Sequence, residues 1–300
     1  MLSIPEKATQ IVEQILSQAD SDSSRTIFFV GSKDVGKSTL INAFMNKTEI
    51  PKETLLLEYS FGRKSNSKQH IEKNVYHIWE YGGKLETLNN ILLTLPVKGQ
   101  FFYCIFFDLS KLKRLWETVE NCVNALNELR SKSDVESTCI MIGGKYDLFK
   151  NYDTEVKKIV CTTLRSVAIL QNAHLLFYSS KDSALLKYTK DMLNNIGFGN
   201  GIPFKEKNIN FMKPLIVPKG SDNWESIGIS SSTFDEVKLR YISKIGTDPV
   251  NKLSVATKSQ KSSHPESSVD SLTKLKYDEL RTSDLLDITI NDYLQSINKQ

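Results

Sequence analysis

The sequence predicts an α/β fold in which helices cover both faces of a mostly parallel, doubly wound sheet. Two observations support this. Short apolar runs alternate with longer amphipathic stretches between residues 26 and 196, and a glycine-containing loop joins the first strand to the next helix. Strands separated by helices of this length connect through right-handed crossovers and form parallel sheets.

The elements follow one another in the order of the strand, glycine loop and helix unit and then alternate. Residues 26–30 form a short buried strand, 31–38 the loop, and 38–46 the first helix of the unit. The remaining elements are predicted as strands at 55–61, 75–80, 101–108, 138–143 and 173–179, helices at 112–129, 153–172 and 183–196, and a helix or extended loop at 87–95. Before them, residues 4–19 place apolar residues at helical spacing, and we expect this amphipathic helix to pack on the core rather than on a membrane.

Composition excludes several classes of protein. The 39 basic and 35 acidic residues are spread along the 300-residue chain and form no basic block. Nucleic acid is therefore not the expected partner. The longest strongly apolar run, residues 101–107, is far shorter than the ~20 residues of a membrane-spanning helix, and residues 1–24 do not have the pattern of a secretory signal. The four cysteines form no CxxC pair and no metal-ligand spacing with histidines; we expect Cys104 and Cys139 to be reduced core residues.

The loop GSKDVGKS predicts phosphate binding. Its glycines let successive backbone N–H groups face an anion, Lys37 would reach the β- and γ-phosphates, and Ser38 would bind Mg²⁺. Between a buried strand and a helix, this motif predicts a P-loop NTPase fold of the small-GTPase kind. The predicted phosphate-binding residues are Gly31, Ser32, Lys33, Asp34, Val35, Gly36, Lys37, Ser38 and Thr39.

Two later segments predict guanine as the base. GGKYD, residues 143–147, resembles the (N/T)KxD motif of GTPases, with Lys145 and Asp147 in place but Gly144 where Asn or Thr is usual. SSK, formed by Ser179, Ser180 and Lys181, resembles the loop that contacts the guanine oxygen. GTP or GDP is therefore favoured over an adenine nucleotide, and a nucleotide-free state stays open.

The catalytic half of the site departs from the GTPase pattern. Where small GTPases have DxxGQ, this chain has Glu80, then Tyr81, Gly82, Gly83 and Lys84. Glu80 would serve the metal, but a lysine cannot orient the attacking water as glutamine does, so we predict slow GTP hydrolysis or none. Thr54 is the candidate second Mg²⁺ ligand; an exposed loop threonine is the alternative.

Five segments carry a more specific resemblance. They are GSKDVGKSTL (31–40), LEYSFGRK (57–64), HIWEYGG (77–83), DLS with LW (108–110 and 115–116) and IGGKYDLF (142–149), extended by residues 158–168 and 177–186. Together they resemble the light intermediate chain family of cytoplasmic dynein, in its dynein 2 form. The match covers roughly residues 26–198.

The resemblance implies a non-motor subunit. Such a subunit packs its Ras-like domain on the tail of the dynein 2 heavy chain, supports assembly of the complex, and works with other dynein 2 subunits and intraflagellar transport particles in retrograde transport. It would be found in the cytoplasm, on the cytoskeleton and in the cilium, at axoneme and basal body. The alternative is a regulatory GTPase that cycles between GTP and GDP. It stays open because the motif residues Lys37, Ser38, Lys145 and Asp147 are intact.

These patterns divide the chain into five predicted parts. An N-terminal helix (1–24) precedes the Ras-like P-loop domain (25–200). A Pro- and Gly-punctuated extension (201–242) packs on that domain or on the heavy chain, a polar stretch (243–271) is a disordered linker, and 272–300 form a short partner-binding helix.

Overall fold

The computed structural model describes residues 24–65, 73–133, 135–198 and 206–247, together with 269, 271, 272 and 274–276. The predicted N-terminal helix lies outside this part of the chain, apart from Ser24. So do the predicted linker and terminal helix, apart from residues 243–247 and the last six residues given above. The chain divides into two units, 1–248 and 249–300. In the second unit the described residues are helical and expose Leu272 and Leu275.

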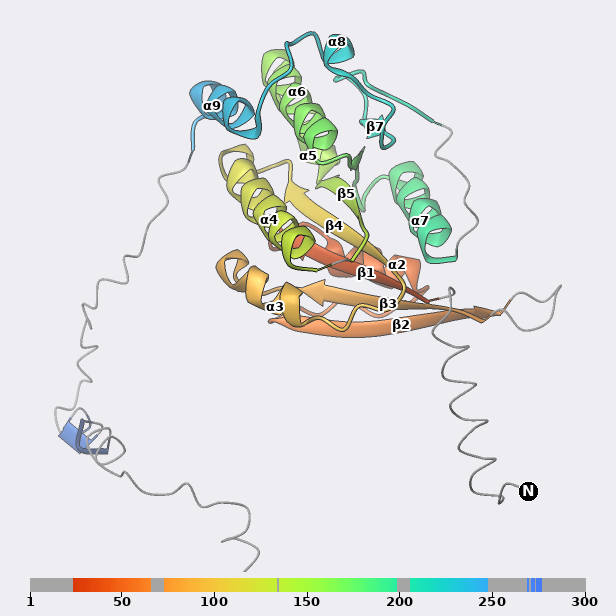
Figure 1. Ribbon diagram of the computed structural model, residues 1–300, viewed down its shortest axis with the longest axis vertical. Helices are drawn as coiled ribbons and strands as arrows, with labels where there is room; N and C mark the ends of the chain where they lie inside the picture. The colour runs from red at the N-terminus through yellow and green to blue at the C-terminus, as the bar shows by residue number, and fades with distance from the viewer. Residues whose placement is uncertain are drawn as a thin grey trace, which may run out of the picture. The chain divides into compact units, whose positions relative to one another are not determined.

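The alternation predicted from the sequence is confirmed through residue 198 (Figure 1). The strands of this stretch are β1 (Ser24–Gly31), β2 (Leu57–Ser65), β3 (Lys73–Tyr81), β4 (Gln100–Asp108), β5 (Ser137–Gly144) and β6 (His174–Phe177). The helices are α2 (Lys37–Phe44), α3 (Leu88–Thr94), α4 (Leu112–Lys132), α5 (Tyr146–Phe149), α6 (Thr154–Leu170) and α7 (Ser183–Phe198), with a 3-10 turn η1 (Leu85–Thr87) before α3.

The described strands form one sheet in the order β2-β3-β1-β4-β5-β6-β7, where β7 is Ile216–Val217. The pairs β1–β3, β1–β4, β4–β5 and β5–β6 are parallel, and only the two edge strands, β2 and β7, run antiparallel to their neighbours. The sheet is therefore mostly parallel and doubly wound, as predicted. Its central strands β1 and β4 are buried on both faces, which is why they read as continuous apolar runs.

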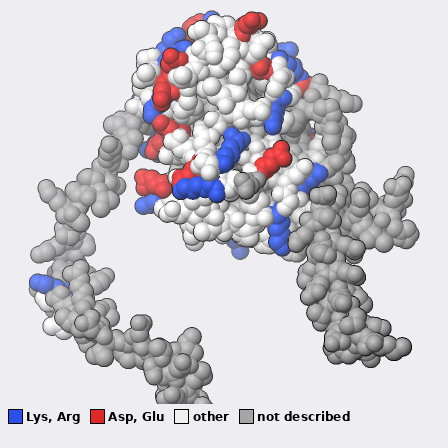
Figure 2. All heavy atoms as spheres, in the orientation of Figure 1, with Lys and Arg blue, Asp and Glu red and all other residues white. Residues whose placement is uncertain are grey.

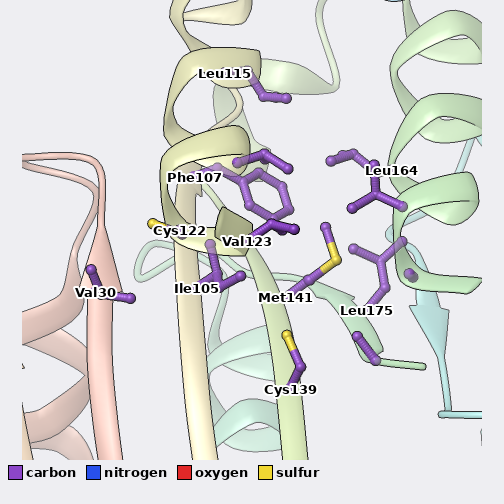
Figure 3. Close-up of a cluster of buried hydrophobic side chains, with 14 of the residues drawn as sticks. Val30, Ile105, Phe107, Leu115, Cys122, Val123, Cys139, Met141, Leu164 and Leu175 are labelled. Carbon is purple, nitrogen blue, oxygen red and sulfur yellow. The ribbon is translucent and has the colours of Figure 1, made fainter. Parts of the chain in front are cut away.

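Two layers of apolar side chains enclose the sheet. One face is covered by α3, α4 and α6, with the C-terminal helix α9 (Phe234–Ile245) packed on α4 and α6, and the other face is covered by α2 and α7. Figure 3 shows the first layer, where Cys122 of α4 and Cys139 of β5 lie among Val, Ile, Leu and Met side chains. All four cysteines are free and buried, which confirms the prediction for Cys104 and Cys139.

The segment after α7, predicted as a Pro- and Gly-punctuated extension, contains regular elements of its own. It contains β7, the short helix α8 (Trp224–Ile227) and the twelve-residue α9. A capping box between Thr233 and Glu236 starts α9 and satisfies backbone donors at its first turn. The helix continues past the predicted boundary at residue 242 to Ile245, so residues 243–245 are not part of a linker.

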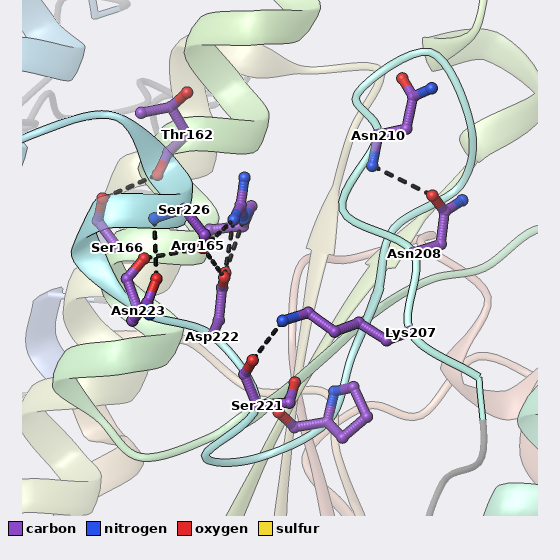
Figure 4. Close-up of polar contacts among 11 residues, drawn as sticks. Thr162, Arg165, Ser166, Lys207, Asn208, Asn210, Ser221, Asp222, Asn223 and Ser226 are labelled. Carbon is purple, nitrogen blue, oxygen red and sulfur yellow. Dashed lines mark hydrogen bonds and ion pairs between the residues drawn. The ribbon is translucent and has the colours of Figure 1, made fainter.

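This C-terminal extension is held to the domain by the pairing of β7 with β6 and by buried side-chain contacts at two further places. The Arg165 guanidinium of α6 donates from Nε and Nη2 to both Asp222 carboxylate oxygens at 2.7 Å, and both side chains are buried (Figure 4). At the second place Tyr241 donates from its hydroxyl to the Leu112 carbonyl at 2.7 Å, and Trp116 of α4 packs against Phe234 and Tyr241. The hydrophobic core on this face of the sheet therefore includes four buried residues of the extension: Leu215, Val217, Val237 and Tyr241.

Charge is mixed over the surface. On the face shown in Figure 2, basic and acidic side chains are interspersed with one another and with neutral residues. That face carries no continuous field of one sign of the kind that follows a phosphate backbone.

Candidate nucleotide-binding site

The loop after β1 takes its shape from its glycines. Gly31 has φ 129°, and a Cβ there would lie 1.8 Å from the Phe106 carbonyl oxygen, which also accepts a hydrogen bond from the Ser32 amide at 2.8 Å. Asp34 and Gly36 also have positive φ, and no side chain caps the start of α2 at Gly36. Backbone N–H groups in such a loop, together with the open helix N-terminus, form a cradle for an anion.

Lys37 supplies a buried cation inside this loop. It is 6% exposed, and its ammonium group donates to the Ser32 carbonyl at 2.9 Å and the Gly31 carbonyl at 3.3 Å. Burial lowers the pKa of Lys37, while the nearby Glu80 carboxylate raises it in part. A buried cation with only this partial charge compensation is stabilised by an anion bound in the loop.

Three side chains with oxygen atoms that suit a metal ion lie beside the loop. Ser38 donates from Oγ to Glu80 Oε1 at 2.7 Å, and the buried Thr54 hydroxyl also interacts with the Glu80 carboxylate. Burial raises the pKa of Glu80, although the Ser38 hydrogen bond and Lys37 counteract it. Hydroxyl and carboxylate oxygens gathered in this way fit Mg²⁺. Thr54 is therefore a buried residue and not the exposed loop threonine of the alternative reading.

Thr54 reaches this position because the chain after β3 is unusually close to it. The Gly82 amide donates to the Leu56 carbonyl at 2.9 Å, and a Cβ on Gly82 would lie 1.8 Å from the Thr54 carbonyl oxygen. Only glycine fits at this approach.

These elements enclose a cavity of about 320 Å³. The Lys33 ammonium and the Glu53 carboxylate pair across it at 2.5 Å, and both side chains are largely exposed. The cavity is lined by Lys33, Asp34, Val35, Gly36, Lys37, Ser38, Thr39, Pro51, Lys52, Glu53, Thr54, Glu80 and Gly82. The structure thus brings the predicted phosphate-binding residues 33–39 and the predicted metal ligands around one cavity. Gly31, Ser32 and the predicted base-reading residues do not line it.

The base-reading residues form a neighbouring network. The Ser179 hydroxyl donates to Asp147 Oδ1 at 2.7 Å and the Lys181 ammonium lies 3.4 Å from Oδ2, while Ser180 is exposed. Burial raises the pKa of Asp147, but these two partners outweigh burial and the net pKa is lowered. The carboxylate is thus kept ionised, as an acceptor of guanine N–H donors must be.

Lys145 has a partner that the sequence analysis did not assign. Its ammonium donates to Asp108 Oδ2 at 2.8 Å, and the other Asp108 oxygen accepts from the Ser110 amide and hydroxyl. Asp108 is 2% exposed at the carboxyl end of β4, in register with Gly144 of β5. Its place at the carboxyl end of a central parallel strand, where ligands bind in such sheets, was the signal that could have identified it.

The segment that would carry the catalytic glutamine has a fixed backbone. The Tyr81 hydroxyl donates to the Lys84 carbonyl at 2.7 Å and lies 2.8 Å from the Thr87 hydroxyl. The Lys84 side chain is exposed. Position 84 therefore places an exposed cation, and no water-orienting amide, after β3.

None of the helices in the described part of the chain is long and apolar enough to cross a membrane. No group of three or more His, Cys, Asp or Glu side chains in that part of the chain is arranged to hold a metal ion.

Comparison with known proteins places this site in a family. Residues 26–147 match the family model described as Ras of Complex, Roc, domain of DAPkinase. The chain is 33% identical over 244 residues to cytoplasmic dynein 2 light intermediate chain 1 of Bos taurus, covering 68% of each chain. It is 29% identical to the protein of the same name from Danio rerio, covering 74% of this chain and 71% of the relative.

A solved structure supports the same fold. The crystal structure of the conserved domain of a dynein light intermediate chain aligns with a TM-score of 0.51 at 14% sequence identity, over 73% of this chain and 88% of that chain. At this identity the likeness concerns the fold alone. The 33% identity to the Bos taurus relative over 68% of both chains shows that the chain belongs to the cytoplasmic dynein 2 light intermediate chain family.

Proposed function

We propose that this chain is the non-motor light intermediate subunit of a dynein 2 complex, and that it binds the heavy-chain tail and supports its assembly and stability. The observation that carries the proposal is the 33% identity to a dynein 2 light intermediate chain over about two thirds of both chains. The altered segment after β3 agrees with it, because Lys84 stands where a signalling GTPase needs its glutamine.

The proposed cellular role and location follow from the proposed complex. As a dynein 2 subunit the chain would act with the other subunits and with intraflagellar transport particles in retrograde transport and cilium assembly. Its locations would be the cytoplasm, the cytoskeleton and the cilium, including axoneme and basal body.

Nucleotide has a structural role in this proposal. GTP or GDP would lie with its phosphates in the loop 31–39, held by the backbone cradle and Lys37, and with its base at Asp147. Ser38, Thr54 and Glu80 would hold Mg²⁺, whose charge would neutralise the phosphates. A ligand that binds only the folded state stabilises it by about 4 kcal/mol at a thousandfold excess over its dissociation constant.

Co-expression with the tail of a dynein 2 heavy chain tests the proposal. The account predicts that the two chains elute together in size-exclusion chromatography and that the soluble yield of the tail rises. A Ras-like GTPase with the same tag, expressed with the same tail, is the control. Separate elution of this chain and the tail at micromolar concentrations would reject the proposal.

A second function is favoured by one observation, the assembled Ser38–Glu80 pair beside a buried Lys37. These residues suit a regulatory GTPase whose partner affinity changes with nucleotide state. Two affinities of the heavy-chain tail distinguish the regulatory GTPase from the structural subunit. One is measured for the GDP-loaded chain, and the other for the chain loaded with a non-hydrolysable GTP analogue. Equal affinities support the structural subunit, whereas a change of about tenfold or more, a coupling of ~1.4 kcal/mol, supports the regulator.

A further inference from the structure

The edge strand β2 exposes aromatic side chains on one face. Tyr59 and Phe61 are 46% and 63% exposed, although they stack on one another and Tyr59 packs at 4.7 Å between ring centroids on Trp79 of β3. The Tyr59 hydroxyl also hydrogen-bonds His77 Nδ1 at 2.7 Å. We call these four residues, Tyr59, Phe61, His77 and Trp79, the aromatic patch.

The aromatic patch continues the hydrophobic core past the end of its helical cover. On the same face of β3, Tyr81 is buried in the core with α3 residues Leu88 and Leu92. Two residues earlier Trp79 is only partly buried, and its indole N–H, itself shielded from solvent, has no acceptor within the described residues. Helix α3 has seven residues, too few to extend over the rest of this face.

An exposed aromatic face on an edge strand needs a cover. Ordered aromatic side chains that remain in contact with water forgo a large hydrophobic stabilisation, and edge strands with apolar faces associate with other chains unless they are protected. The cover must present an apolar stripe wide enough for two strands, which is the geometry of an amphipathic helix on a sheet.

We infer that residues 4–19 of this chain are the cover, docked as an amphipathic helix on the aromatic patch. These residues lie outside the described part of the chain, but their sequence has the required stripe. Its apolar members are Ile4, Ala8, Ile11, Val12, Ile15, Leu16 and Ala19. Sixteen helical residues extend about 24 Å, enough to span the patch.

The chain connection allows this docking. Ser24, the first residue of β1, is in register with Val75 of β3, and Phe61 is in register with His77, two residues further along β3. Two strand spacings across and two residues along place Phe61 about 12 Å from Ser24. The five peptide links from residue 19 to Ser24 reach up to about 17 Å, so the segment arrives without strain.

Covalent attachment favours this segment over another occupant. A short tether raises the effective concentration of the helix at the patch to about the millimolar range. A second copy of the chain, or another protein, would have to outcompete it at ordinary concentrations.

Hydrogen exchange on the full chain tests the inference. We expect the amides of residues 4–19 to be protected, and protection to fall about tenfold in the Phe61→Ser variant, since one aromatic contact is worth about that factor. Leu239→Ser, which alters an exposed residue of α9, is the matched control and should leave protection unchanged. The reciprocal variant Ile11→Ser should increase exchange in β2.

Three results would overturn the inference. The first is absence of protection at residues 4–19 in the unmodified chain. The second is equal protection in Phe61→Ser and Leu239→Ser, which would place the helix elsewhere. The third is protection that disappears on dilution, which would make a second copy the occupant. Because the measurement uses the isolated chain, its result is independent of heavy-chain binding.

Discussion

Gly144 of β5 lies directly against Val35 of the phosphate loop. A Cβ on Gly144 would be 2.5 Å from Val35 Cγ2 and 2.8 Å from the Val35 carbonyl oxygen, closer than such atoms approach in proteins. The phosphate loop therefore occupies the space that the side chain of the usual Asn or Thr of the base-reading motif would need. The departure is built into the packing of the site.

The variant Gly144→Asn should therefore weaken the site and not restore it. We expect a loss of about 1–3 kcal/mol in the free energy of unfolding from overpacking, together with weaker guanine nucleotide binding. Thermal unfolding and nucleotide titration measure the two effects. Adding Val35→Ala should recover part of the stability, since it removes the nearer contact. Tighter GTP binding by the single variant would contradict this account.

Mg²⁺ should strengthen nucleotide binding through the Ser38–Glu80 pair. The variants Ser38→Ala and Glu80→Gln should each reduce the difference between nucleotide affinity with Mg²⁺ and with a chelator. Thr39→Ala, next in sequence and not assigned to the metal, is the control. An unchanged Mg²⁺ effect in both variants would remove these residues from the metal site.

The same site predicts a pH dependence. Burial raises the pKa of Glu80 above its usual 4.5, so between 4.5 and the raised value the folded protein holds a proton that the unfolded chain releases. Protons therefore compete with Mg²⁺ as the pH falls toward 4.5, and the Mg²⁺ contribution to nucleotide affinity should decline in that range. Glu80→Gln should abolish the decline. Isothermal titration across this pH interval provides the measurement.

GTP hydrolysis should be no faster than that of small GTPases acting alone, which is roughly 4 × 10⁻⁴ s⁻¹. The cause is Lys84, whose ammonium cannot orient a water. Single-turnover assays should show a higher rate for Lys84→Gln than for Lys84→Met. Hydrolysis by the unmodified chain that clearly exceeds the small-GTPase rate would refute the assignment.

The Arg165–Asp222 pair should fasten the C-terminal extension to α6. Because both side chains are buried, Asp222→Ala should cost about 3 kcal/mol in the free energy of unfolding. The exposed pair formed by Lys132 and Glu128 is the comparison, and Lys132→Ala should cost about 0.5 kcal/mol or less. Denaturant unfolding of the two variants measures both losses in the free energy of unfolding. Equal losses would show that the buried pair does not fasten the extension.

Acid should release this contact. Burial raises the pKa of Asp222, but the hydrogen bonds from Arg165 and Ser226 outweigh it and leave the pKa below the usual 3.8. The pair therefore stabilises the fold fully above pH 3.8 and loses that effect as the pH falls through the lowered pKa. The stability difference between the unmodified chain and Asp222→Asn should shrink over the same interval.

Sequence reasoning located the sheet and the loop because their signals are local. A buried strand, a glycine loop and a helix follow one another within about twenty residues, and apolar runs such as β4 identify central strands directly. The two-residue strand β7 has no such signal, since pairing with β6 alone defines it. Helix α9 did have one, the capping box at Thr233 and Glu236, which the surrounding prolines and glycines obscured.

The site was predictable in its residues and only partly in its geometry. The P-loop positions follow from one motif, but the close approach of Gly144 to Val35 and the Asp108–Lys145 ion pair join segments far apart in sequence. Spacing along the chain carries no information about such contacts.

Affinity purification of this chain from ciliated cells of its source organism tests the central claim most directly. The account predicts recovery of a dynein 2 heavy chain in near-stoichiometric amount under mild conditions, with equal recovery by the Lys84→Gln variant. Purification of the folded chain without any dynein heavy chain under the same conditions would contradict it.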